Sequence, residues 1–95
     1  MDKRRHERKK KRILIRMNGK PAVLQDISRS GIQLTCATIP GERQVDVTIV
    51  YGDKKFDLTG LIRWVRRQVT FHSPKNIGIS LVQPPKEYIQ FIDSL

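Results

Sequence analysis

Apolar and polar residues alternate along most of the chain in short runs, a period that is typical of strands with one buried face. These runs occupy residues 12–17, 21–27, 31–36, 44–50, 55–67 and 76–82. Turn-forming pairs separate several of them, most clearly Asn18-Gly19, which is a strong signal for a two-residue hairpin, and Pro40-Gly41. The pattern therefore predicts six short strands.

The longest run, 55–67, places Phe56, Leu58, Ile62 and Trp64 in one phase. That phase predicts that Trp64 packs in the core or at the rim of the sheet, with stacking on a bound base as the alternative. Gly60 interrupts the run, and a glycine inside a strand favours a bulge or a bend at that position.

The last segment, residues 84–95, begins with two prolines and continues with a helical pattern. Four apolar side chains share the predicted face: Tyr88, Phe91, Ile92 and Leu95. We predict an all-β fold, a small six-stranded antiparallel barrel with Greek-key-like order, and a short C-terminal helix that caps one opening. Closure into a barrel removes the exposed strand edges that so small a sheet would otherwise carry.

The net charge of +10 is concentrated at the N-terminus. Residues 1–12 hold eight Lys or Arg against two acidic residues, a net +6, whereas the other 83 residues supply 11 − 7 = +4. Dense like charges repel each other, so we expect residues 1–12 to form a flexible basic arm and residues 13–95 to form the barrel domain. Such an arm favours a phosphate-bearing partner, and a merely solvated tail is the alternative.

Several classes of function find no support in the sequence. A chain of 95 residues makes one domain, and it has neither an apolar run of about 18 residues nor a secretory signal, so we expect a cytoplasmic protein without a membrane span. Cys36 alternates with core positions and is expected to be buried. His6 and His72 lack partners at metal-ligand spacing, and Ser28 and Ser30 lack a recognisable base. We therefore predict no enzyme, no metal and no cofactor.

Residues 26–34, DISRSGIQL, place an acid, two hydroxyls, an arginine and a glycine between two apolar runs. Turn chemistry alone would explain that composition. Upstream, however, RRHER supplies an RxxxR pattern at Arg4 and Arg8, and Asp26, Ser28 and Gly31 supply DxSxxG. The chain resembles the PilZ family, whose members carry these two motifs in this order. The resemblance covers nearly the whole chain, including RWVRR, the late IGISLV and the terminal helix.

The resemblance implies that the chain binds the bacterial second messenger cyclic di-GMP, which has two phosphates and two guanines. The guanidinium forks of Arg4 and Arg8 suit phosphate oxygens or guanine O6 and N7, and Arg5 adds a stacking face or a further phosphate contact. Asp26 accepts hydrogen bonds from guanine N1–H or N2–H₂, while Ser28 contacts a base or a phosphate.

Gly31 is expected to supply turn geometry and to let the ligand approach closely. The alternative for Asp26 and Ser28 is that they only cap the turn through side-chain bonds to the backbone. Arg29 and Ser30 occupy variable positions of the motif and are expected to be surface residues without a role in binding.

The function that these features imply is a sensor or adaptor module for second-messenger signalling. One or two ligand molecules would draw the arm onto the barrel, reshape the face beside residues 26–31, and thereby signal to a protein partner. One alternative is a barrel that binds RNA or DNA through the arm and the Arg63, Arg66 and Arg67 patch, although no exposed aromatic platform is evident. A second is a PilZ-like protein-interaction module without nucleotide binding.

Overall fold

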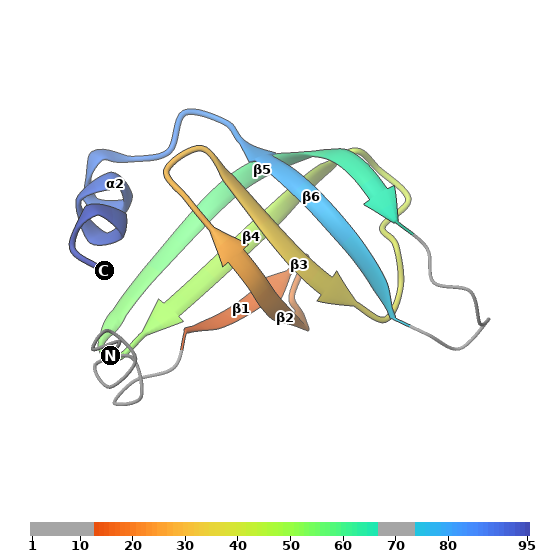
Figure 1. Cartoon of the computed structure of the whole chain (residues 1–95), viewed down its shortest axis with the longest axis horizontal. Helices are drawn as coiled ribbons and strands as arrows, with labels where there is room; N and C mark the ends of the chain where they lie inside the picture. The colour runs from red at the N-terminus through yellow and green to blue at the C-terminus, as the bar shows by residue number, and fades with distance from the viewer. Residues whose placement is uncertain (1–12, 67–73) are drawn as a thin grey trace, which may run out of the picture.

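The computed structural model of the chain describes residues 13–66 and 74–95, which form six strands and one short helix (Figure 1). The elements are β1 (Leu14–Met17), β2 (Lys20–Ile27), β3 (Gly31–Cys36), β4 (Gln44–Tyr51), β5 (Lys54–Arg66), β6 (Lys75–Leu81) and α2 (Lys86–Asp93). All six predicted strands are present, each within a few residues of its expected bounds.

The strands close into a barrel in the order β1-β2-β3-β6-β5-β4, and β4 pairs with β1 to complete the circle. Every neighbouring pair is antiparallel. Strands β4, β5 and β6 are consecutive neighbours and β3 lies beside β6, so the connection from β3 to β4 crosses the barrel without pairing the two strands, which is the Greek-key arrangement. The predicted fold class is confirmed.

The β1–β2 hairpin turns where the sequence predicted. Asn18 and Gly19 have φ angles of 55° and 81°, as a two-residue turn with both central residues in the left-handed region requires. The Asn18 backbone N–H donates to the Asp46 carbonyl at 2.8 Å, and its side-chain Oδ1 accepts from the Asp46 N–H at 2.9 Å. These two bonds fasten the turn to β4.

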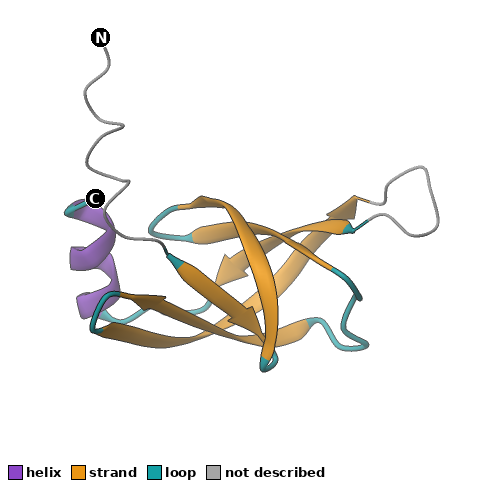
Figure 2. Cartoon of the chain, turned by 90° about the horizontal axis from the view of Figure 1, so that it is seen from below, coloured by secondary structure: helices purple, strands orange, loops and turns teal. Residues whose placement is uncertain are grey.

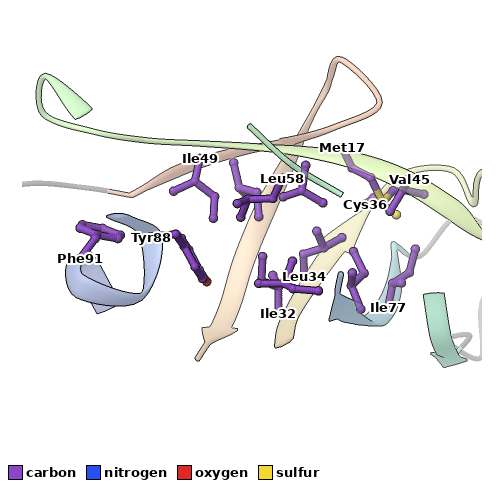
Figure 3. Packing of buried hydrophobic residues seen from close by; sticks show 14 residues of the cluster. Met17, Ile32, Leu34, Cys36, Val45, Ile49, Leu58, Ile77, Tyr88 and Phe91 are labelled. Carbon is purple, nitrogen blue, oxygen red and sulfur yellow. The ribbon is translucent and has the colours of Figure 1, made fainter. Parts of the chain in front are cut away.

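The barrel interior holds one continuous apolar core, drawn from five of the strands and from α2 (Figure 3), and partly buried residues of β2 pack against it. Leu34, Val47, Ile49 and Ile77 are completely buried within it. Cys36 belongs to this core, as expected, and its Sγ donates to the Thr38 carbonyl at 3.1 Å. Burial raises the pKa of the Cys36 thiol, so the thiol stays protonated and unreactive at neutral pH.

Helix α2 closes one end of the barrel, as predicted (Figures 1 and 2). Tyr88 and Phe91 project from it into the core, where the Phe56 ring centroid lies 5.8 Å from that of Tyr88 and 5.1 Å from that of Phe91. Leu95 is 58% exposed, so the expectation that it shares the buried face is wrong. The helix ends at Asp93, and helical spacing no longer decides where Leu95 points.

Two strands contain a β-bulge, one in β2 between Leu24 and Asp26 and one in β5 between Ile62 and Trp64. An inserted residue reverses the side on which all later side chains of the strand point. The second bulge turns Trp64 to the outer face, where its side chain is 38% exposed. Of the two places predicted for it, the core and the rim of the sheet, the core is therefore wrong. The sequence predicted a bulge or a bend at Gly60, but the bulge lies further along the strand, and Gly60 itself is paired and buried.

Substitution of Gly60 by alanine is expected to destabilise the barrel by about 1–3 kcal/mol, because a methyl group there would overlap Cγ2 of the buried Ile79 side chain. Urea unfolding followed by tryptophan fluorescence measures the effect. Gly41→Ala is the matched control, since Gly41 is exposed and nothing lies within 4 Å of the added carbon. Equal unfolding midpoints for the two variants would contradict the expected overpacking.

Candidate functional site

Four paired positions form a row across the outer face of strands β2, β3, β6 and β5. Asp26 pairs with Gln33, Gln33 with Gly78, and Gly78 with Trp64. The two bulges lie at the two ends of this row, and each turns its end residue outward. Without them, strand alternation would direct both Asp26 and Trp64 into the apolar core.

Trp64 lies across Gly78, and the indole accounts for the burial of that glycine. A methyl group on Gly78 would overlap the indole ring, so only glycine allows this packing. The Arg66 guanidinium carbon lies 5.3 Å from the Trp64 ring centroid, a cation–π distance. The sequence indicated no exposed aromatic platform, and that expectation is wrong at this position.

A pocket of about 170 Å³ is formed beside this row. Its lining residues are Asp26, Ser28, Gly31, Ile32, Gln33, Arg63, Trp64, Gly78 and Ile79. All three residues of the predicted DxSxxG motif are therefore brought together in one concave site. A larger hollow of about 640 Å³ lies between α2 and the β4–β5 hairpin, but it contains none of the predicted site residues.

Asp26 and Ser28 both bond to the backbone of the β2–β3 turn. The Ser28 hydroxyl accepts from the Gly31 N–H at 3.1 Å and donates to the Gly31 carbonyl at 3.2 Å. Asp26 Oδ1 accepts from the Ile27 N–H at 2.9 Å. Both residues thus serve the turn, as the turn-capping alternative held, and the same bonds fix their position at the rim of the pocket.

Gly31 does not adopt the left-handed conformation that often requires glycine in a turn. The glycines with positive φ among the described residues are Gly19 and Gly52. At Gly31, a methyl group would come within 3.0 Å of the Ile79 carbonyl oxygen. Glycine is therefore favoured here by the close approach of β3 to the backbone of β6.

The β2–β3 turn is also fastened to helix α2. The Tyr88 hydroxyl donates to the Ser28 carbonyl at 2.8 Å. Arg29 forms two hydrogen bonds to Asp93, from Nε at 2.9 Å and from Nη2 at 2.7 Å, and this ion pair lowers the pKa of the Asp93 carboxyl. Arg29 is at the surface, as expected, but it also joins the motif turn to the helix.

The pocket contains two further polar groups: Gln33, which the sequence did not single out, and Arg63, which the sequence assigned only to a basic patch for RNA or DNA. Both residues line the pocket, and neither side chain forms a hydrogen bond or ion pair with another residue of the described ranges 13–66 and 74–95. Arg63 enters the site because it is the extra residue of the β5 bulge. Arg4, Arg5 and Arg8 lie outside the described residues.

The strands and the helix form a small closed β-barrel domain with a concave pocket on its outer face. A model of the PilZ domain family matches residues 2–95, and the chain belongs to that family. The PilZ domain is a noncatalytic receptor module, so the prediction that the chain is not an enzyme is confirmed, and the family typically binds cyclic di-GMP. Searches of curated proteins and of solved structures found no match.

Within the residues that the structure describes, no helix is long and apolar enough to span a membrane.

Burial raises the pKa of Tyr88 to about 12. An unfolded chain ionises tyrosine near pH 10, so the free energy of unfolding should fall as the pH rises from about 10 toward 12. Tyr88→Phe should lose about 1 kcal/mol at neutral pH with the bond to Ser28, and should show a flatter decline in alkali. Urea unfolding of the two proteins at several pH values from about 8 upward measures the loss of stability and the slope of the decline. The titration of lysines affects both proteins equally, so it cancels in the difference between their unfolding free energies. Parallel profiles for the two proteins would contradict this assignment.

Proposed function

We propose that this chain is a cyclic di-GMP receptor module that changes conformation on binding and signals to a partner protein. The observation that carries the proposal is the pocket that unites Asp26, Ser28 and Gly31 in a member of the PilZ family. The polar groups there match the ligand: the Asp26 carboxylate can accept from guanine N1–H and N2–H₂, and the Arg63 guanidinium can donate to a phosphate or to O6 and N7.

The pocket is too small to enclose the whole ligand. Its volume of about 170 Å³ is well below the roughly 300–1,000 Å³ of sites that bury a drug-sized molecule. It suits a single base, so the phosphates and the second base would lie on the outer face of the barrel. Additional cations are then needed to bind them, and we propose that Arg4, Arg5 and Arg8 supply these.

The direction of β1 supports a role for the N-terminal residues. Strand β1 pairs with β2 in antiparallel register, Ile15 opposite Ala22 and Met17 opposite Lys20. The first residue of β1 therefore lies toward the C-terminal end of β2, which is the end that carries Asp26. Residues that precede β1 start their path near the motif turn, within reach of an anion bound there.

The contacts between the turn and α2 offer a route for the signal. Ser28 and Arg29 belong to the motif turn, and they bond to Tyr88 and Asp93 of the helix. A ligand that shifts the turn would alter these contacts and so move α2 against the barrel end. We propose that a partner protein recognises the changed surface.

The direct test is titration calorimetry of the unmodified chain with cyclic di-GMP at physiological salt. Asp26→Ala and Arg8→Ala should each lose about 2–5 kcal/mol of binding free energy, because each leaves a charged or polar group of the ligand without its partner. Asp53→Ala and Arg16→Ala are the matched controls, since both side chains are exposed and lie outside the pocket. Circular dichroism establishes that every variant is folded, and the titration itself gives one or two ligands per chain.

Absence of heat at micromolar ligand would reject the nucleotide-sensor function. The exposed Trp64 beside Arg63 and Arg66 keeps RNA or DNA binding as the competing function, since base stacking on an aromatic ring with basic neighbours is how single strands are held. Affinity for many nucleic acids with a steep salt dependence, and no preference for cyclic di-GMP, would favour that alternative.

Amide hydrogen exchange tests the part assigned to residues 1–12. Saturating cyclic di-GMP should slow exchange in that segment, because the bound phosphates would draw its cations to the barrel. Strand β4, which contributes no residue to the pocket, provides the internal control and should not change. Unchanged exchange in residues 1–12 while ligand is bound would remove this segment from the site.

A further inference from the structure

We propose that Gln33 is a ligand-contacting residue whose side-chain amide donates to guanine O6 while Asp26 accepts from N1–H and N2–H₂ of the same base. The inference rests on the proposed function and adds to the predicted motif a residue that the motif does not contain. Together the two side chains would bond all three polar groups, O6, N1–H and N2–H₂, that lie side by side on one edge of guanine.

The placement of Gln33 follows from strand register. Gln33 lies directly opposite Asp26, and the Cβ atoms of such cross-strand neighbours are about 4.5–5.5 Å apart. The bulge in β2 turns Asp26 to the outer face, on which Gln33 already points. Both side chains are exposed and line the same pocket, so both can reach the edge of one planar base.

The amide of Gln33 is available for a ligand. Its neighbour Gln25 donates to the Thr35 hydroxyl at 3.0 Å, and Thr35 in turn donates to the Asn76 side-chain oxygen at 2.7 Å. Gln33 lies next to this bonded series, yet its amide has no hydrogen-bond partner among the residues that the structure describes. An amide offers two donors and one acceptor oxygen, and O6 of guanine requires a donor.

Trp64 and Gly78 limit where the base can lie. The indole covers Gly78 and closes the pocket on the side of β5, two strands from Gln33. Neighbouring strands are about 4.8 Å apart, so the space between the Trp64 backbone and that of Gln33 is about 10 Å wide and is partly filled by the indole. A purine in the remaining space has its edge toward β2 and β3, where Asp26 and Gln33 are.

The proposal predicts an effect that depends on the atom at position 6 of the base. Gln33→Ala should weaken binding of cyclic di-GMP about tenfold in calorimetry, the usual effect of losing one hydrogen bond. It should weaken the inosine analogue, which lacks N2–H₂ but keeps O6, by a similar factor. It should have a clearly smaller effect on the 6-thioguanine analogue, whose sulfur is a poor acceptor. Gln25→Ala is the matched control and should leave all three affinities unchanged.

The outcomes separate this inference from the proposed function. Equal loss for all three ligands would mean that Gln33 acts only through the shape of the strand, and would overturn its contact with O6. Binding of cyclic di-GMP by the unmodified chain with no difference between Gln33→Ala and Gln25→Ala would also overturn it, while leaving the receptor function intact. No binding of any of the three ligands by the unmodified chain would overturn both.

Discussion

The phase of strands β2 and β5 is the constraint on which the pocket depends. Side chains on a strand alternate between core and solvent, and an acid or a large indole in the core phase would be costly to bury or to fit. One inserted residue in each strand reverses that phase at the same level of the barrel. The bulges therefore allow a continuous apolar interior on one side of the sheet and a polar concave site on the other.

The pocket also depends on two positions where the residue is glycine and has no side chain. Gly31 permits β3 to approach the backbone of β6, and Gly78 leaves the room in which the indole of Trp64 lies. Larger residues at these two positions would force the strands apart or remove the aromatic wall. The site thus combines polar side chains that line the pocket with glycines that determine its depth.

Periodicity and turn chemistry were sufficient to predict the strands, the Asn18-Gly19 hairpin and the capping helix, because each depends on residues close together in the sequence. The DxSxxG motif likewise identified three residues that the structure places in one pocket. Trp64 was assigned to the wrong face because a bulge changes the phase without a clear sequence signal. Gln33 was missed because only register brings it beside Asp26. Arg63 was assigned only to the basic patch, because the bulge that brings it to the pocket has no clear sequence signal.

Arg29 shows a similar limit, since its partner Asp93 is separated from it by 64 positions. It stands between Ser28 and Gly31 in the motif, yet it is bonded to the helix and is not among the pocket residues. The side chains that line the pocket and the side chain that forms the ion pair with α2 are therefore different residues of one short turn. Two members of such a family could bind the same ligand with equal affinity and still differ in how strongly α2 responds to it.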